Sequence, residues 1–233
     1  MAKIVEGIYG RTAVPPENLI VLAKAPVAGF SKTRLCPPCS PAQAALLAES
    51  ALIDTLDAVL RTPCDRRVLV FDQGSSPDDA PSSRWWRRGF DVIAQGAGGL
   101  GERLAQAFAD VGGPSFLVAM DTPQVTPRLL RAGLDLLRSH DATLGLAEDG
   151  GYWGIGLAVP RRDVFDGVPM SDASTGSAQL DRLLALGLSI AELPVIRDVD
   201  TFADAVTVAG LAPNGRFAAA VRRVTPGWGV TPG

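Results

Sequence analysis

The chain has 233 residues, a length that suits one large α/β domain. Hydrophobic residues make up 47% of it, which is enough for a sizeable core and too much for a disordered chain. The formal net charge is −3, from 22 basic and 25 acidic residues, so no global positive field exists to hold a nucleic acid, and any phosphate binding must be local.

The sequence shows no export or membrane signal. The first eighteen residues lack the continuous apolar segment and the small-residue cleavage site of a signal peptide. No apolar run approaches the roughly 18 to 20 residues that a membrane-spanning helix needs. The three cysteines, Cys36, Cys39 and Cys64, are too few for a disulfide scaffold. We therefore expect a cytoplasmic protein without a membrane or nucleic-acid partner.

Apolar runs typical of buried strands alternate with helical patterns along the chain. We expect a loose leader over 1–17, one domain over 18–224 and a flexible tail over 225–233. The predicted elements are, in order, strand 18–23, helix 41–60, strands 67–71 and 91–94, helix 100–111, strand 115–120, helix 127–139, strands 142–147 and 152–159, a helix near 177–186, strand 189–193 and two C-terminal helices. The alternation predicts a mostly parallel sheet with helices on both faces, whose ligands bind beyond the carboxyl ends of the strands.

The loop after the first strand carries three cations. Lys24, Lys32 and Arg34 lie within eleven residues that also include Pro, Gly, Ser and Thr. Such a loop could surround a polyphosphate with cationic side chains and backbone amides. The P-loop pattern is not met, because two residues separate Gly29 from Lys32. A solvated basic loop is the alternative.

Aspartates follow the fourth strand and the last strand. Asp121 comes directly after 115–120, and Asp198 and Asp200 lie between the last strand and the next helix. Carboxylates in these places favour a Mg²⁺ or Mn²⁺ site that holds phosphates, because hard cations prefer oxygen ligands. The alternative for Asp121 is a cap of the following helix.

The segment EDGGYW, residues 148–153, places two carboxylates, two glycines and two aromatic residues in one turn. Glycines permit close approach of a ligand, and a carboxylate beside aromatic rings is a common way to hold a sugar or another polar acceptor. A plain hairpin turn is the alternative.

A glycine run offers a rival function. Residues 96–101 satisfy G-x-G-x-x-G, and Asp121 follows Gly101 by twenty residues, as in a dinucleotide-binding site. The strand before this run is short and ends in Gln95 instead of leading directly into the first glycine. An NAD-dependent oxidoreductase is therefore the weaker alternative, and a nucleotide-binding module without turnover is another.

Cysteines, the histidine and a tryptophan pair give weaker signals. Cys36 and Cys39 form a C-P-P-C pair, but neither Cys64 nor the single histidine, His140, has the spacing of a further zinc ligand. Residues 85–86, two tryptophans, could stack a base, but a partly buried aromatic pair is the simpler interpretation.

With these residues assembled, the chain resembles the glycosyltransferase-like family of rSAM/selenodomain-associated transferases, within the GT-A nucleotide-diphospho-sugar transferase superfamily. The similar segments are AKAPVAGFSKTRL, QGAGGLGER, MDTPQVTP, AEDGGYW and RDVDT, in the family's order over about residues 18–209. The resemblance implies a three-layer α/β/α domain of GT-A type that uses Mg²⁺ or Mn²⁺, a nucleotide sugar and a small-molecule acceptor.

The chain also resembles, more distantly, the guanylyltransferases of deazaflavin-cofactor synthesis, which share the loop K-T/S-R-L and the closing D-V-D-T. That resemblance implies the alternative reaction, in which an NTP is joined to a phosphorylated small molecule and pyrophosphate is released.

The resemblance further implies roles for individual residues. Asp121 and Asp149 are the candidate catalytic residues, and Asp121 with Asp200 is the candidate metal pair. The residues implied in nucleotide and phosphate binding are Ala23, Lys24, Gly29, Lys32, Arg34, Gln95, Gly99 and Arg103; those implied in acceptor or sugar binding are Asp149, Gly150 and Trp153. The chain departs from the family where AMDTP stands in place of G-x-D-x-P, and where DTFADA replaces D-T-P-E-D-L.

Overall fold

The computed structural model describes residues 15–72 and 88–224. The expected tail, most of the expected leader and the tryptophans at 85–86 lie outside these ranges.

Within the described residues, seven strands form one sheet. They are β1 (Asn18–Lys24), β2 (Arg66–Asp72), β3 (Asp91–Ala94), β4 (Ser115–Ala119), β5 (Ala142–Ala147), β6 (Tyr152–Leu157) and β7 (Ile190–Ile196), in the spatial order β3-β2-β1-β4-β6-β5-β7. β6 runs antiparallel to both of its neighbours, and every other neighbouring pair is parallel. The expected α/β domain with a mostly parallel sheet is confirmed.

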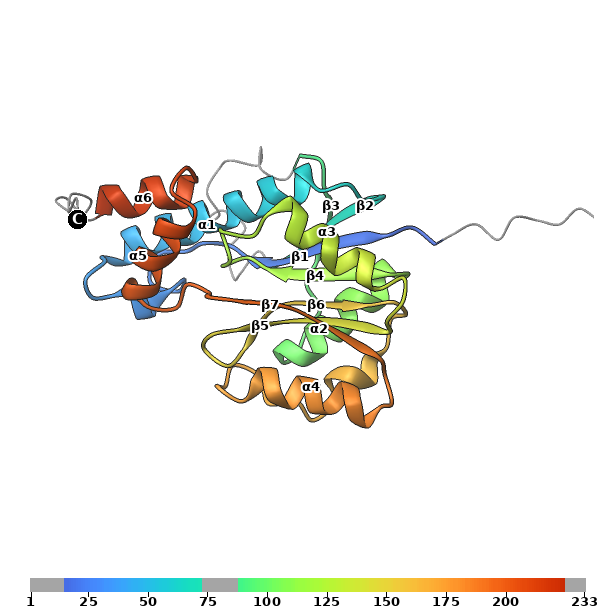
Figure 1. Cartoon of the computed structure of the whole chain (residues 1–233). Helices are drawn as coiled ribbons and strands as arrows, with labels where there is room; N and C mark the ends of the chain where they lie inside the picture. The colour runs from blue at the N-terminus through green and yellow to red at the C-terminus, as the bar shows by residue number, and fades with distance from the viewer. Residues whose placement is uncertain (1–14, 73–87, 225–233) are drawn as a thin grey trace, which may run out of the picture.

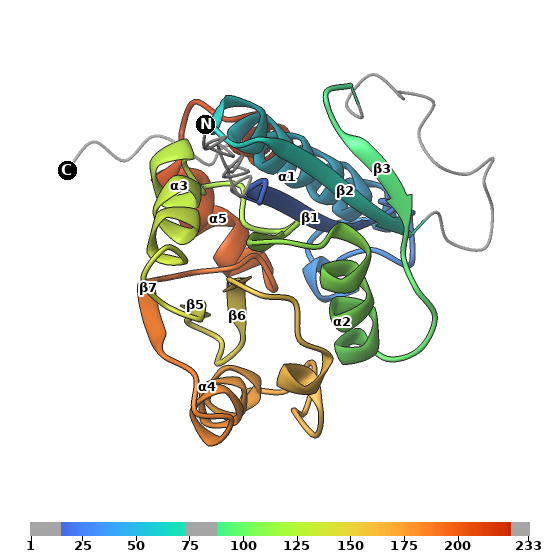
Figure 2. The same ribbon diagram turned by 90° about the vertical axis from the view of Figure 1, so that its right-hand side faces the viewer.

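Helices cover both faces of this sheet. They are α1 (Pro41–Arg61), α2 (Leu100–Val111), α3 (Pro127–Leu136), α4 (Thr175–Ala185), α5 (Phe202–Leu211) and α6 (Arg216–Val224), with the 3-10 helices η1 (Thr33–Leu35) and η3 (Arg162–Phe165). α1 and α3 lie on one face and α2 and α4 on the other, while α5 and α6 pack beside α1 (Figure 1). The turned view in Figure 2 shows the same three layers, with β3 and β7 at opposite edges. None of the described helices has both the length and the apolar character needed to cross a membrane.

Adjacent residues of β1 supply two different cores. Leu19 and Val21 pack with side chains of α1 and α3, whereas Ile20 packs with side chains of α2 and α4. Because successive side chains of a strand point to opposite faces, a strand covered on both sides needs apolar residues throughout. The unbroken run NLIVLA is the sequence mark of this central position.

Side-chain caps fix the starts of two helices that border the candidate site. At α1, Ser40 Oγ accepts from Gln43 N–H at 3.2 Å, and Gln43 Oε1 accepts from Ser40 N–H at 2.8 Å. At α5, Thr201 Oγ1 accepts from Asp204 N–H at 3.3 Å, and Asp204 Oδ2 accepts from Thr201 N–H at 2.8 Å. This reciprocal capping fixes the point at which the chain turns from the aspartates of 198–200 into α5.

The element ends that differ most from the sequence prediction are those of the third helix and the last strand. The third helix ends at Leu136, because residues 137–139 close the chain with tighter i to i−3 backbone bonds. The last strand continues through Pro194 to Ile196. A proline removes a ladder donor, but β7 is an edge strand that pairs with β5 alone, so the missing N–H costs no sheet bond.

Phe116 of β4 packs against glycines at the centre of one core. Its ring is fully buried and meets Trp153 edge-on, with ring centroids 5.7 Å apart. An added Cβ would lie 2.7 Å from the ring at Gly133 and 2.5 Å from it at Gly154. The absence of side chains there makes the room for the phenyl ring.

The substitution Gly133→Ala should therefore lower the melting temperature. Overpacking a filled core costs about 1–3 kcal/mol, and each kcal/mol shifts the melting temperature of a chain of this size by roughly 2–4 °C. Gly210→Ala is the matched control, because Gly210 is also helical and has open space around it. Alanine there should be neutral or stabilise by up to about 1 kcal/mol. Equal melting temperatures for the two variants would contradict this packing.

Candidate functional site

A pocket of about 700 Å³ opens beyond the carboxyl ends of β1 and β4. The strand order reverses between these two strands, and open α/β sheets bind their ligands at such a reversal. The walls come from the loop between β1 and η1, residues 95–104, the end of β4, the β5–β6 turn, residues 170–175 and the segment after β7.

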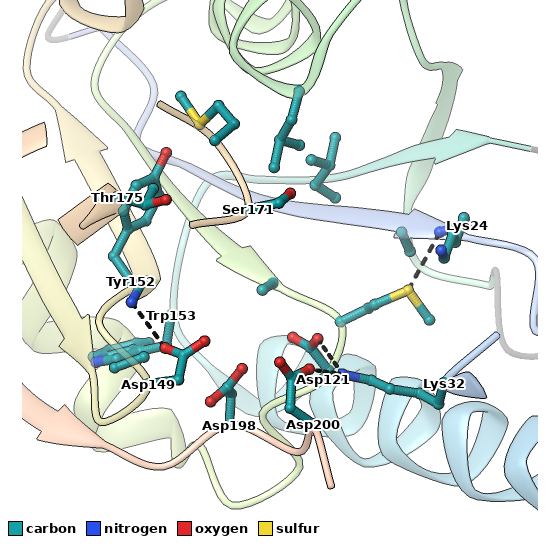
Figure 3. Close-up of a pocket in the computed structure, with 18 of the residues that line it drawn as sticks. Lys24, Lys32, Asp121, Asp149, Tyr152, Trp153, Ser171, Thr175, Asp198 and Asp200 are labelled. Carbon is teal, nitrogen blue, oxygen red and sulfur yellow. Dashed lines mark hydrogen bonds and ion pairs between the residues drawn. The ribbon is translucent and has the colours of Figure 1, made fainter. Parts of the chain in front are cut away.

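The close-up in Figure 3 shows how charged groups divide this pocket. Four aspartates, Asp121, Asp149, Asp198 and Asp200, lie along one side. Lys32 reaches the aspartates at one end of this row, and Tyr152 lies beyond the other end. Cationic and hydroxyl-bearing walls therefore flank a carboxylate row.

The loop after β1 is folded into a compact turn. Ser31 is buried, and its Oγ accepts from Val27 N–H at 2.9 Å and donates to the Ala25 carbonyl at 3.2 Å. Gly29 has a φ of 82°, a left-handed conformation that glycine adopts without steric cost. This turn holds the cations that follow it at the mouth of the pocket.

Three aspartates from two distant segments of the sequence converge near these cations. Carboxylate oxygens of Asp121, Asp198 and Asp200 lie within 4.8 Å of one another. Lys32 Nζ donates to Asp121 at 2.7 Å and to Asp200 at 3.2 Å, and Arg34 donates to Asp200 at 2.8 Å. No lysine or arginine of the described residues forms an ion pair with Asp198.

Electrostatics distinguish Asp198 from its neighbours. Burial, together with the charges of Asp121, Asp149 and Asp200, raises the pKa of Asp198 to about 7. For Lys32, burial works against the charged form, but Asp121 and Asp200 outweigh it and hold the lysine pKa above its ordinary value. Among the three clustered aspartates of the described residues, Asp198 is thus the one without an ion pair to a lysine or arginine.

The three carboxylates fit a hard divalent cation. Oxygen ligands at this spacing could hold Mg²⁺ or Mn²⁺. Among the described residues, this is the one cluster of three or more potential metal ligands, and it contains no cysteine. A helix-capping role for Asp121 is wrong, because Thr126 caps α3 by accepting from Leu129 N–H at 3.2 Å.

The β5–β6 turn brings Asp149 into the pocket. Its Oδ1 accepts from Gly151 N–H at 2.8 Å, and Gly150 has a φ of 91°. Trp153 lies mostly beneath this wall, since it is 1% exposed and its indole N–H donates to the Pro194 carbonyl at 3.0 Å. The turn is a hairpin that also presents a carboxylate.

Gln95 links two further predicted residues. Its Nε2 donates to the Ala23 carbonyl at 2.8 Å, and its Oε1 accepts from Arg103 at 2.9 Å. All three residues line the pocket, as does Lys24. The predicted glycines, Gly29, Gly99 and Gly150, lie in the turns that build the walls and not among the lining residues.

The glycine run 96–101 lies between the edge strand β3 and α2, and of its residues only Leu100 lines the pocket. Gly99 N–H donates to Glu102 at 2.8 Å, so the start of α2 is capped by its own side chain. This arrangement favours a helix-starting role for the glycines over dinucleotide binding.

One wall of the pocket could not be assigned from the sequence. This wall is the segment 170–175, which lines the pocket before α4 begins. Ser171 has a φ of 60°, and Asp172 N–H donates to Thr175 Oγ1 at 3.1 Å. The run SDAST has the composition of a turn before a helix, and it indicates a cap. Nothing in that local pattern indicates that the turn packs against the β5–β6 hairpin.

Residues 55–172 match the model of the DUF2064 family, which is described as an uncharacterized protein conserved in bacteria. The chain belongs to the DUF2064 family. The finer resemblance to rSAM/selenodomain-associated transferases stays a prediction. A comparison with curated proteins gave no match.

Solved structures share the fold of this DUF2064 protein. A candidate nucleotide-diphospho-sugar transferase from Desulfovibrio desulfuricans G20 is 26% identical, with a TM-score of 0.79 over 89% of this chain and 94% of that one. Rv0371c from Mycobacterium tuberculosis H37Rv is 22% identical, with a TM-score of 0.53 over 82% of this chain and 96% of its own. It has also been solved as a manganese complex.

A CTP complex of CMP:2-keto-3-deoxy-manno-octonic acid synthetase is 14% identical, with a TM-score of 0.53 over 85% of this chain and 99% of that one. Likenesses at this level show a shared fold. The fold is thus that of nucleotide-diphospho-sugar transferase and nucleotidyltransferase structures.

The raised pKa of Asp198 predicts a pH-dependent effect of Asp198→Asn. Between pH 4 and 7 the folded state keeps a proton that the unfolded state has lost, so this group makes the metal-free protein less stable as the pH rises to about 7. Asparagine has no charge to bury, so it removes this loss of stability. The rise in melting temperature of Asp198→Asn over the wild type should therefore be larger at pH 8 than at pH 5 by at least about 2 °C. Thermal unfolding in a chelator at both values measures it. The exposed Asp181→Asn is the control, and a pH-independent shift for Asp198→Asn would contradict the assignment.

Proposed function

We propose that this protein is a metal-dependent transferase that moves a sugar from a nucleotide-diphospho-sugar to a small-molecule acceptor. The observation that carries the proposal is the convergence of Asp121, Asp198 and Asp200 with Lys32 and Arg34 at the reversal of strand order. Carboxylates that can hold a divalent cation beside cations that can hold phosphates are what a nucleotide diphosphate requires.

In this proposal the aspartate triad holds Mg²⁺ or Mn²⁺, with Asp121 and Asp200 as the pair implied by the resemblance and Asp198 as the third ligand. The metal, when bound, supplies positive charge for the departing diphosphate. Lys24, Lys32 and Arg34 contact the phosphates directly. Catalysis then rests mainly on positioning and charge neutralisation.

Asp149 is the proposed acceptor-activating residue. Its Oδ1 is fixed by Gly151 N–H, whereas its Oδ2 has no hydrogen-bond partner among the described residues. A carboxylate held in one orientation with a free oxygen can orient an acceptor hydroxyl and take its proton.

Nucleotidyl transfer from an NTP is the second candidate. The observation that favours it is that all three loop cations, Lys24, Lys32 and Arg34, line the pocket. Lys24 has no carboxylate partner among the described residues, so it could bind a leaving pyrophosphate. The similarity to the Desulfovibrio protein supports sugar transfer over this alternative.

A metal-dependent thermal shift is the first expected result. A nucleotide sugar with Mg²⁺ or Mn²⁺ should raise the melting temperature, because a ligand at 100 times its Kd stabilises the native state by about 2.7 kcal/mol. The shift should be lost without metal and in Asp121→Asn, and kept in Asp181→Asn, an exposed aspartate of α4. A full shift in Asp121→Asn would remove that residue from the metal site. A metal-independent shift with NAD(H) alone would support the oxidoreductase.

Asp149→Asn should separate binding from turnover. It should keep the nucleotide-dependent thermal shift and lower kcat by about 10²- to 10⁴-fold, which is the usual contribution of a general base. Product analysis decides the reaction: a nucleoside diphosphate from a nucleotide sugar indicates glycosyl transfer, and pyrophosphate from an NTP indicates nucleotidyl transfer. An unchanged kcat would exclude Asp149 as the base.

A further inference from the structure

Phe30 is the most exposed large apolar side chain of the described residues. It is 80% exposed, and the next, Val159, is 68% exposed. Single exposed apolar residues are common on protein surfaces. Phe30 differs from the other exposed apolar residues in its location, because it lines the candidate pocket. Along the chain it lies between two of the loop cations, Lys24 and Lys32.

The backbone around Phe30 keeps the ring out of the core. Phe30 N–H donates to the Val27 carbonyl at 3.1 Å, and Ser31 N–H donates to the same carbonyl at 2.9 Å. Ser31 is 3% exposed and tied through its hydroxyl to the turn, while Gly29 before it takes a left-handed φ. The ring therefore stands on a fixed turn at the pocket and has no aromatic or cationic partner among the described residues.

The other aromatic residues that line the pocket offer less surface. Among the described residues these are Tyr152 and Trp153. Trp153 is 1% exposed with its N–H already bonded, and Tyr152 packs against the core shared with α2 and α4. Phe30 thus provides the principal exposed aromatic face that the described part of the pocket presents to a ligand.

We propose that the Phe30 ring stacks on the nucleobase of the nucleotide-activated substrate. The inference rests on the proposed function, since it assumes that Lys32 and Arg34 hold the phosphates. Phe30 is two residues from Lys32, within about 8 Å along the backbone, and a nucleotide presents its base and its phosphates at opposite ends of one ribose. Because every base has a π-face, this contact adds affinity and discriminates weakly among bases.

Ligands with and without a base test the proposal. The affinities of ADP, GDP, CDP, UDP and inorganic pyrophosphate, each with Mn²⁺, are measured by calorimetry for the wild type and for Phe30→Ala. Phe30→Ala should weaken each nucleoside diphosphate that the wild type binds by roughly 5- to 50-fold, the lower part of the range for loss of one base–aromatic stack. Pyrophosphate, which has no base, should bind both proteins equally, and Phe30→Tyr should restore nucleotide affinity to within about twofold of the wild type.

Controls separate stacking from other causes. Val159→Ala removes another exposed apolar side chain outside the pocket lining and should change no affinity. Equal nucleotide affinities for Phe30→Ala and the wild type would overturn the proposal and leave the proposed function intact. An equal loss for pyrophosphate would also overturn it, because that result means a distorted loop. If the wild type binds neither nucleotides nor pyrophosphate with metal, the proposed function itself fails.

Discussion

The ammonium group of Lys32 holds the candidate site together. It bonds to Asp121 after β4 and to Asp200 before α5, residues 89 and 168 positions away in the sequence. Its side chain is 17% exposed, so these contacts are poorly screened by solvent. Two carboxylates beside each other repel, and the lysine offsets that repulsion. In the proposed reaction, the same group would exchange carboxylates for phosphate oxygens, so the metal and the substrate would assemble around it together.

The topology divides the pocket into two halves with different chemistry. The parallel strands β1 and β4 deliver the cations and Asp121, which suit a polyphosphate. The antiparallel hairpin of β5 and β6 delivers Asp149, and residues 170–175 lie against it. Figure 3 shows the aspartate row between these walls. In the proposed reaction, the nucleotide occupies the first half and the acceptor the second, with the transferred group over the carboxylates.

The sequence predicted the fold well because the elements here follow local rules. Unbroken apolar runs marked strands covered on both faces, and Ser40 before Pro41 marked the start of a long helix. The end of β7 was not predicted, because a proline usually ends a strand. Pro194 is accommodated within β7 because β7 lies at the edge of the sheet, and an edge position is a tertiary property. A place in the pocket was predictable for residues that directly follow a strand, such as Asp121. The site was not predictable where the geometry is long-range, as for the ion pairs of Lys32 and the burial of Trp153.

The contact between Gly150 and Ala173 joins the two segments of the acceptor half. A Cβ at Gly150 would overlap the Ala173 carbonyl, and Gly176 N–H donates to the Gly150 carbonyl at 2.7 Å. The hairpin turn and the segment before α4 are therefore in direct contact, so a change in the position of one requires a change in the other. If these segments hold the acceptor as proposed, a change of acceptor within the family would require coordinated changes in both of them. The loop between β1 and η1, which has its own internal hydrogen bonds, could stay unchanged during such a change.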